Sequence, residues 1–320
     1  MTAPKPMLAP NESVDFDDPR IPAVTLCSDK LDGMRVLAID GVLYSRNLKP
    51  LRSEIQERWK PFLDASRTHV FDGEIFEYGN PDFGSLMTKI AKSGTDVPDT
   101  LAIQCFDCVP LARWQHKNYA VDFASRTSEL EYLLTAAPKL NLLAKACNVV
   151  PLTQYYVDSP HNLELAFKAA IARGTEGLIV RDPHAPYKHG RATLLQGSMF
   201  KFKEWVTQDG RITGFKRGTK MKESVRTGER TRDAFGHREI SHKKDTREPS
   251  DVIGSFEVTL QDGRIIGAGL KKGVDAYWDT SWEGRNFYLN RMVEVEYQQH
   301  GTKSLPRFSR ITRLRPDLDL

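Results

Sequence analysis

The stretch Lys30-Leu31-Asp32-Gly33-Met34-Arg35 decides the fold assignment. It sets a lysine, a residue able to act as a nucleophile, beside a carboxylate, a glycine and an arginine on a short extended segment. Four further patches follow it in order: Ser45-Arg46-Asn47, Phe71-Asp72-Gly73-Glu74, Glu176-Gly177-Leu178-Ile179-Val180-Arg181 and Lys201-Phe202-Lys203. A Lys-x-Asp-Gly sequence alone arises by chance in many unrelated chains, whereas the ordered set is specific.

The residues that follow Lys30 predict a β-hairpin. Two strand-like runs, 35–39 and 42–46, flank Asp40-Gly41, a dipeptide that favours a two-residue hairpin turn. Such a hairpin folds Arg46 back toward Lys30. Further strands are expected at 69–78, 101–107, 149–157, 177–181 and 198–204, and amphipathic helices at about 53–63, 125–135 and 160–173.

Strand periodicity groups the charged side chains. Lys201 and Lys203 share one face of their strand, because side chains alternate, and Asp72 and Glu74 likewise point the same way. With Glu176, these groups match the needs of phosphoryl transfer: cations for phosphate oxygens, carboxylates for a divalent metal, and a nucleophile. Taken alone, the lysine pair is more typical of a charged surface strand.

The length and texture of the chain predict two domains. A chain of 320 residues is long for one domain, and the pattern changes after Trp205. Short strands at 212–215, 252–260, 264–270 and 292–299, with a helix-like insert at 274–289, suggest a small β-barrel over 208–320. The first domain is then 1–207, with the linker near 205–210. The proline-rich residues 1–22 suggest a loosely ordered lead-in.

Basic residues concentrate in the C-terminal third. The whole chain carries a net charge of +4, but 216–247 has eleven Lys and Arg against five Asp and Glu. A second basic cluster occupies 303–315. Two such zones indicate contact with a polyanion, although a solvated charged loop is the alternative for the first zone. Within a basic insert at about 216–250, the candidate nucleic-acid-binding residues are Lys216, Arg217, Lys220, Lys222, Arg226, Arg230, Arg232, Lys243 and Lys244.

Cysteine content and hydropathy exclude several classes. The four cysteines are too few and too scattered for a disulfide framework, so reduced thiols are expected. Cys105-x-x-Cys108 has no second close-spaced pair, which disfavours a zinc site. No apolar run is long enough to span a membrane, and the N-terminus lacks the apolar core of a signal peptide. A soluble, cytoplasmic protein is the expectation.

Together the five patches resemble the covalent nucleotidyltransferase superfamily, and within it the ATP-dependent DNA ligases of the small, two-domain bacteriophage type. The resemblance runs over about 26–315. It implies an α+β fold: an ATP-grasp-like nucleotidyltransferase core, with antiparallel sheets and flanking helices, followed by an OB-fold barrel. It also implies adenylylation of the lysine by ATP, AMP transfer to a 5′-phosphate, and attack by the neighbouring 3′-hydroxyl. The implied cofactors are ATP and Mg²⁺ (or Mn²⁺). The implied partner is nicked duplex DNA, sealed in replication, repair or recombination by a monomer that needs no protein partner.

The resemblance also assigns roles to residues. By this resemblance Lys30 carries AMP, Glu74 lies near the ribose or the metal, and Glu176 supports the metal. Phe106 resembles the aromatic that stacks on adenine, with a core phenylalanine as the alternative. The full nucleotide-binding set is Ser28, Asp32, Gly33, Arg35, Arg46, Glu74, Phe106, Glu176, Arg181, Lys201, Lys203, Arg307 and Arg310.

Three members of this set stand apart from the rest. Residues 306–315, which include Arg307 and Arg310, resemble the C-terminal motif of ligases, which contacts the pyrophosphate end of ATP when the barrel closes over the site; a basic surface tail is the alternative. Ser28 stands where many ligases carry a glutamate, two residues before the lysine, which leaves open how adenine is recognised.

Three functions are compatible with the sequence. The first is an ATP-dependent DNA ligase. The second, in the same superfamily, is RNA end joining or mRNA guanylylation, from which nucleotide choice discriminates. The third is a non-catalytic nucleic-acid clamp, against which the intact Lys30, Glu74, Glu176, Lys201 and Lys203 count. NAD-dependent ligases add zinc-finger and helix-hairpin-helix domains that this chain lacks room for.

Overall fold

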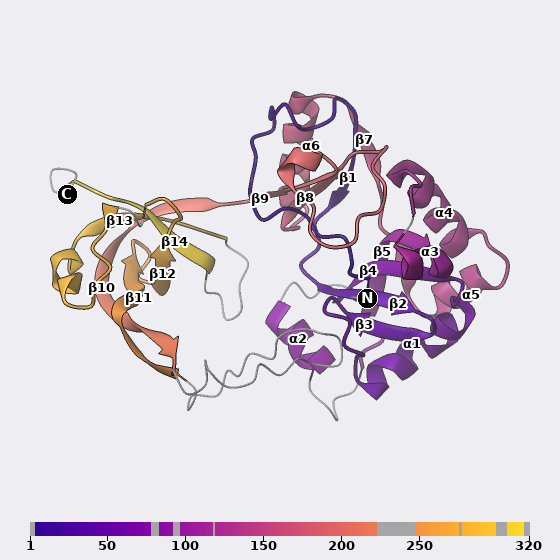
Figure 1. Ribbon diagram of the computed structural model, residues 1–320, viewed down its shortest axis with the longest axis horizontal. Helices are drawn as coiled ribbons and strands as arrows, with labels where there is room; N and C mark the ends of the chain where they lie inside the picture. Colours follow the sequence, from indigo (N-terminus) through magenta and orange to yellow (C-terminus); the bar gives the residue numbers. More distant parts are fainter. Residues whose placement is uncertain are drawn as a thin grey trace. The chain divides into compact units, whose positions relative to one another are not determined.

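The chain forms two compact units, Met1–Lys203 and Glu204–Leu320 (Figure 1). The computed structural model describes residues 4–77, 83–91, 97–117, 119–222, 247–274, 277–298 and 306–316. Strand β10 (Val206–Met221) begins at the residues expected to link the two domains. Each unit has its own hydrophobic core.

A five-stranded sheet in unit 1 contains the predicted hairpin. Its order is β3-β2-β4-β5-β6, formed by Val42–Ser45, Met34–Ile39, His69–Glu77, Leu101–Pro110 and Val149–Pro151. Asp40 and Gly41 close the β2–β3 turn with φ of 47° and 81°, so the two-residue hairpin is confirmed. Helices α1 (Ser53–Ala65), α4 (Phe123–Thr135) and α5 (Leu140–Ala146) pack against this sheet (Figure 1).

A four-stranded sheet carries the lysine patches. Its order is β7-β1-β8-β9, formed by Tyr155–Val157, Thr25–Asp29, Gly177–Arg181 and Met199–Lys203. Helix α6 (Pro160–Ala172) covers one face and is the helix predicted at 160–173. Gly174 follows its end with φ of 80°. The shorter elements α2 (Phe83–Ala91), α3 (Leu111–His116) and η1 (Leu194–Gln196) complete the described part of this unit.

The predicted strand at 149–157 is two strands in two different sheets. Strand β6 runs parallel to β5, and β7 runs antiparallel to β1. Leu152 N donates to the carbonyl of Cys105 at 2.7 Å, and Tyr155 already pairs with Cys27. Residues 152–154 therefore carry the chain from one sheet to the other.

The prediction of a loosely ordered lead-in is wrong for residues 4–22. The side chain of Met7 is 1% exposed, and Leu8 forms a parallel bridge with Arg191. Further along, the ring of Phe16 stacks on Phe202 at 4.7 Å. Residues 5–10 form the N-terminal segment. Its main chain pairs with 190–192, because Leu8 N donates to Gly190 O and Ala192 N donates to Leu8 O.

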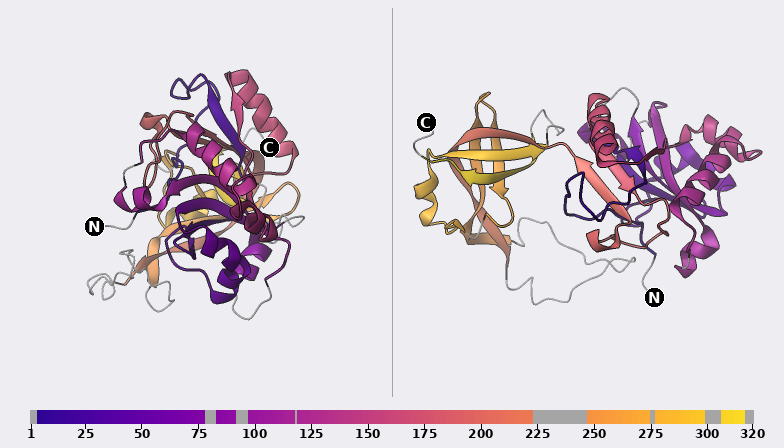
Figure 2. Two further views of the ribbon diagram at one scale, coloured as in Figure 1. Left: turned by 90° about the vertical axis from the view of Figure 1, so that its right-hand side faces the viewer. Right: turned by 90° about the horizontal axis from the view of Figure 1, so that it is seen from above.

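Unit 2 is a closed barrel of order β10-β11-β12-β14-β13 (Figure 2). The strands after β10 are β11 (Arg247–Leu260), β12 (Ile265–Leu270), β13 (Met292–Gln298) and β14 (Arg307–Leu314). Strands β12 and β14 are parallel, and the other neighbours are antiparallel, which is the strand order of an OB-fold. The expected helix-like insert contains the short 3₁₀ helix η4 (Gly284–Tyr288). The predicted α+β fold class is confirmed.

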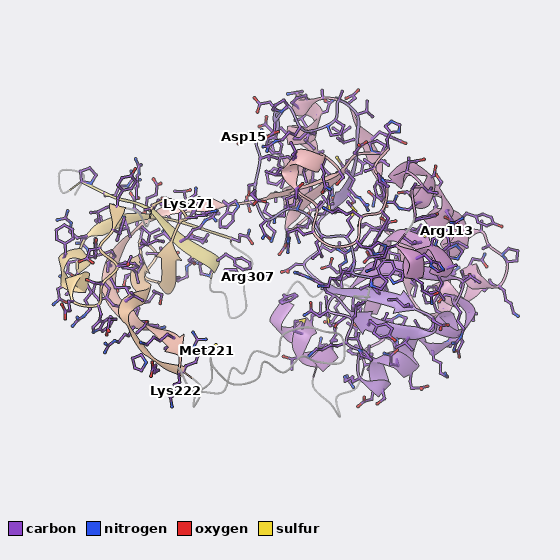
Figure 3. All side chains as sticks on the ribbon, in the orientation of Figure 1. Asp15, Arg113, Met221, Lys222, Lys271 and Arg307 are labelled. Atoms are coloured by element: carbon purple, nitrogen blue, oxygen red, sulfur yellow. The ribbon has the colours of Figure 1, made fainter. Side chains whose placement is uncertain are left out.

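The basic segment does not interrupt the barrel where the sequence suggested. Residues 216–221 continue β10, which pairs with β11 as far as Met221 and Arg247. Met221 and Lys222 lie at the end of this two-stranded ribbon (Figure 3). Lys216, Arg217, Lys220 and Lys222 are thus on or next to the ribbon. Arg226, Arg230, Arg232, Lys243 and Lys244 lie outside the described residues.

Membrane spans and cysteine sites can be tested over the same described ranges. There, no helix is long and apolar enough to cross a bilayer. The four cysteines are buried and free of disulfides.

Candidate active site

Lys30 directly follows β1 and is held by main-chain bonds to Glu176 and Gly177, at the start of β8. Its N–H donates to the carbonyl of Gly177 at 2.9 Å, and the N–H of Glu176 donates to the carbonyl of Lys30 at 3.0 Å. Gly177 has φ of 137°, and a Cβ there would lie 2.0 Å from the carbonyl oxygen of Phe202. Only glycine allows this approach, so the Glu-Gly pair positions Lys30.

The ammonium groups of Lys30 and Lys203 share one carboxylate. Both pair with Oε2 of Glu176, Lys203 at 3.2 Å. Burial alone would raise the pKa of Glu176, but the positive charges of Lys30 and Lys203 outweigh burial and lower it to about 2. Asp32 is a close neighbour of the same carboxylate. Glu176 therefore stays ionised and fixes both lysines.

Glu74, on β4 of the five-stranded sheet, lies next to the turn that follows Lys30. Its Oε1 accepts from the N–H of Gly33 at 2.9 Å, and a Cβ on Gly33 would lie 2.3 Å from the carbonyl oxygen of Ile75. Burial, together with repulsion from Glu176, raises the pKa of Glu74. Two carboxylates that repel each other beside a phosphate site fit a Mg²⁺ ion, which takes one or two carboxylates and completes its shell from phosphates and water. Among the described residues, no three acidic, His or Cys side chains are placed so that they alone could hold a metal ion.

Two rows of side chains cross the same face of the four-stranded sheet. Register places Ser28 opposite Ile179 and Ile179 opposite Lys201; the second row is Lys30, Gly177 and Lys203. Residues opposite one another on neighbouring strands share a face. The predicted alternation of β9 is confirmed, since its two lysines are partly exposed and its phenylalanines are buried.

Lys201 lies in a strongly positive environment. Burial lowers the pKa of Lys201 to about 8, with help from the charges of Lys203, Arg191 and Lys30. Burial and the charges of Arg191 and Arg35 likewise lower the pKa of Arg46. These cations repel one another, so bound phosphate would relieve the repulsion. Arg191, absent from the sequence-predicted set, thus belongs to the same group.

Arg35 and Phe106 line the five-stranded sheet near Glu74. The Arg35 guanidinium donates to both oxygens of Asp72, at 2.8 and 2.6 Å, and lies 4.7 Å above the ring of Phe106. The register of β4 and β5 shifts between Asp72 and Gly73, leaving Phe106 as an extra residue. Such a bulge re-aims a side chain. The ring is therefore on the Arg35 side and is not part of the buried core.

Arg181 is placed away from Lys30. Its guanidinium donates to Oδ2 of Asp107 at 2.7 Å, and Arg126 donates to both oxygens of the same carboxylate at 2.7 and 3.1 Å. All three side chains are at most 4% exposed. This network joins β5, α4 and β8. The structure gives Arg181 a structural partner rather than a place among the groups around Lys30.

The N-terminal segment offers its carbonyl oxygens to the cations of the site. Arg35 Nη2 donates to the carbonyl of Met7 at 2.8 Å, Arg191 Nη1 donates to that of Ala9 at 2.5 Å, and Lys201 donates to that of Pro10. These carbonyl oxygens accept hydrogen bonds from Arg35, Arg191 and Lys201 that phosphate oxygens could accept in their place. Sequence interpretation missed this segment, since its only signal was a run of prolines.

Tyr187 and His189 form hydrogen bonds to the N-terminal segment, and Trp114 packs against both rings. Tyr187 donates its hydroxyl to Asp72 at 2.7 Å and accepts from the N–H of Met7 at 3.1 Å. His189 bonds to the carbonyl of Lys5. Trp114 packs edge-on against both rings, at 5.6 Å from Tyr187 and 4.8 Å from His189.

Several of the described basic residues of unit 2 are paired with acids. Arg310 pairs with Glu296 and lies 4.0 Å above the ring of Trp205, and Arg307 lies near the ring of Phe308. On the ribbon, Arg217 pairs with Asp251 at 2.5 Å, Lys216 with Glu257 at 3.6 Å and Lys220 with Glu248 at 3.5 Å. Exposed pairs of this kind contribute about 0–1 kcal/mol each, so phosphates can replace the acids.

Known proteins resemble this chain in sequence profile and in fold. The family described as "ATP dependent DNA ligase domain" matches residues 6–203. No curated protein sequence matches the chain. Three solved structures are similar in fold. The structure "Pmar-Lig_Pre." has a TM-score of 0.71 and 20% identity, with 97% of this chain and 67% of that chain covered. A Lig E DNA ligase, described as binding DNA with a minimal scaffold, has a TM-score of 0.67 and 19% identity, with 97% of this chain and 99% of that chain covered, and the Chlorella virus DNA ligase-adenylate has a TM-score of 0.51 and 20% identity, with 98% and 100% covered. Since the family profile covers more than half of the chain, and the lysine, carboxylate and cation patches converge within it, this chain belongs to the ATP-dependent DNA ligase family.

Proposed function

We propose that the protein seals nicks in duplex DNA through a covalent bond between Lys30 and AMP. The observation that carries this proposal is the shared carboxylate: Glu176 holds Lys30 and Lys203 together, and Lys201 lies on the same face of the sheet. This arrangement gives a nucleophile flanked by cations, as phosphoryl transfer requires.

The reaction has three displacements at phosphorus. Deprotonated Lys30 Nζ attacks the α-phosphorus of ATP, a nitrogen–phosphorus bond forms, and pyrophosphate leaves. An oxygen of the DNA 5′-phosphate then attacks the same phosphorus and releases the lysine. Finally, the 3′-hydroxyl loses its proton, attacks the activated 5′-phosphate and expels AMP. Lys201 and Lys203 neutralise the charge that grows on the phosphate oxygens.

The remaining residues bind and orient the nucleotide. Arg35 and Arg46 contact the ribose and phosphates, Phe106 stacks on the base, and Gly33 with Asp32 shapes the turn after Lys30. Glu74 and Glu176 would hold Mg²⁺ or Mn²⁺, which when bound shields the negative charge of the phosphates. Arg307 and Arg310 take the pyrophosphate end, for which Arg310 must exchange Glu296 for phosphate.

DNA is bound through phosphates by the basic ribbon of unit 2. Lys216, Arg217, Lys220 and Lys222 supply the described part of this surface, and their exposed acid partners leave at little cost. Binding of this kind is independent of base sequence. Because one chain carries both the lysine and the ribbon, we propose that it works as a monomer.

Label transfer tests the proposal. The protein is incubated with Mg²⁺ and α-phosphate-labelled ATP or GTP, and the adduct is chased with nicked DNA or nicked RNA. An ATP adduct that is lost in Lys30→Ala, kept in Lys168→Ala on the exposed side of α6, and chased into sealed DNA is the expected result. A GTP adduct points to guanylylation, an adduct inert on DNA to an RNA ligase, and no adduct to a binding protein.

A further inference from the structure

One buried hydrogen-bond acceptor in unit 1 has no part in the chemistry above. The amide oxygen Oε1 of Gln154 is shielded from solvent and receives no hydrogen bond. Burying an acceptor without a donor costs free energy, so native proteins rarely keep one without a reason. A ligand that brings its own donor would satisfy this atom.

The place of Gln154 in the fold indicates which ligand that is. Gln154 is the last residue of the crossing segment 152–154. This segment starts beside Cys105, the neighbour of Phe106, where Leu152 N donates to the Cys105 carbonyl. It ends at Tyr155, which pairs with Cys27 in the four-stranded sheet. Gln154 directly precedes β7, and continuing the β1–β7 register by one residue places it opposite Ser28. It therefore extends the row of Ser28, Ile179 and Lys201, on the face that carries Lys30.

The two sheets approach each other at this face. Gly33, three residues after Lys30, donates to Glu74 of the five-stranded sheet at 2.9 Å, and the charge of Lys30 acts on Glu74. Phe106 on one sheet and Ile179 on the other are both partly exposed apolar side chains. In the proposed function, a nucleotide with its α-phosphate at Lys30 would place its base against Phe106. Gln154 extends the row of Ser28 and Ile179 on the four-stranded sheet.

We propose that Gln154 selects the base of the nucleotide, its Oε1 accepting a hydrogen bond from the 6-amino group of adenine. The inference rests on the proposed function, in which ATP occupies this space. It also supplies the base contact that the short side chain of Ser28, which is 3% exposed, leaves open. An amide acceptor facing an amino donor satisfies both groups on binding.

The choice of analogue matters, because an amide turned by half a rotation would present its NH₂ to the 6-oxygen of guanine. Comparison with GTP is therefore ambiguous. Purine riboside 5′-triphosphate differs from ATP only by a hydrogen in place of the 6-amino group. Its use isolates the one hydrogen bond at issue.

The test measures the second-order rate constant of Lys30 adduct formation with ATP and with purine riboside triphosphate. The wild-type protein is expected to prefer ATP by about tenfold or more, the size of one buried acceptor left unsatisfied. Gln154→Leu should reduce the preference to near unity, chiefly by losing activity with ATP. Gln154→Glu keeps an acceptor and should keep the preference, as should Thr153→Ala at the exposed neighbouring position.

A second buried amide sharpens the test. Oε1 of Gln104 also receives no hydrogen bond, and Gln104 lies opposite Glu74 on the other sheet. The proposal would be overturned if Gln154→Leu kept the wild-type preference for ATP over purine riboside triphosphate. It would also be overturned if Gln104→Leu, and not Gln154→Leu, lost that preference. Should the leucine variant not fold, Gln154→Met removes the acceptor at equal length. Absence of any adduct with ATP in the wild-type protein would instead refute the proposed function.

Discussion

At the scale of single residues, the site depends on glycines that let strands approach Lys30. Gly177→Ala should lower the free energy of unfolding of unit 1 by roughly 3 kcal/mol, because the new Cβ would lie 2.0 Å from a carbonyl oxygen. The same change should slow Lys30 adenylylation, since Gly177 holds the main chain of Lys30. Urea unfolding and adduct formation measure the two effects. Gly174→Ala is the control: its φ is also positive but its surroundings are open, so about 1 kcal/mol and full activity are expected.

Also at this scale, Lys201 predicts a pH dependence. Its pKa is lowered to about 8 by burial and by neighbouring cations, so its charge disappears as pH rises through that value. The groups that act on it are Lys203, Arg191, Lys30 and Glu12. The profile of kcat/KM for ATP in adduct formation should therefore fall above pH 8. In Lys201→Arg the fall should move to higher pH; an unchanged profile would assign it to another group.

Sequence reasoning at the residue scale succeeded where a local rule applies. Alternation along β9 predicted the shared face of Lys201 and Lys203, and Asp40-Gly41 predicted the hairpin turn. It did not anticipate the partner of Arg181, because Asp107 is 74 positions away and pairs only in the folded chain. A charged residue in a motif can serve the fold as well as the ligand, and one sequence does not separate the two.

At the scale of elements, Asp107 joins the two sheets through Arg126 of α4 and Arg181 of β8. Asp107→Asn leaves two buried guanidinium groups without a counter-charge, which should cost unit 1 about 3–5 kcal/mol of unfolding free energy. Burial would raise the pKa of Asp107, but Arg126 and Arg181 outweigh it and the net shift is downward.

The sign of the pH effect follows from that shift. The carboxylate stabilises the fold above its unfolded pKa of about 4, and this contribution is lost as pH falls through the lower folded value. Urea unfolding between neutral and acidic pH should show a steeper loss for wild type than for Asp107→Asn. Asp15→Asn, at an exposed position, should behave as wild type.

Elements whose partners are distant in sequence were the ones that prediction missed. The N-terminal segment is ordered by 190–192 and by Tyr187, about 180 residues along the chain, while its prolines alone suggest a loose lead-in. Residues 149–157 read as one strand because a crossing of three residues leaves no break in the apolar pattern. Helices α2, α3 and α5 are short, so they show too few turns for their period to stand out.

At the scale of the whole molecule, the lysine and the basic ribbon belong to separate compact units. Replacing 222–246 with a short turn keeps the β10–β11 pairs, of which Met221 with Arg247 is the outermost. Affinity for nicked DNA should fall, and the slope of log K against log salt should decrease by about 0.9 for each phosphate contact removed. Lys30 adenylylation should be unchanged. A variant that loses adduct formation would contradict this division between the units.

The overall architecture was predictable because it rests on several independent patterns. Strand alternation, turn dipeptides and the spacing of charged patches each gave part of the α+β core, and short strands after Trp205 indicated the barrel. The extension of β10 through 216–221 was not predictable, since exposed basic residues carry no apolar period and are held only by pairing with β11.

Trp114 gives the molecule a built-in optical signal. It packs on Tyr187 and His189, which contact the N-terminal segment, and that segment's carbonyls occupy Arg35 and Lys201. Phosphates that take these donors would free the segment and change the polarity around the indole. Its emission should then shift on mixing with ATP, and stopped-flow fluorescence would time nucleotide entry without any attached dye.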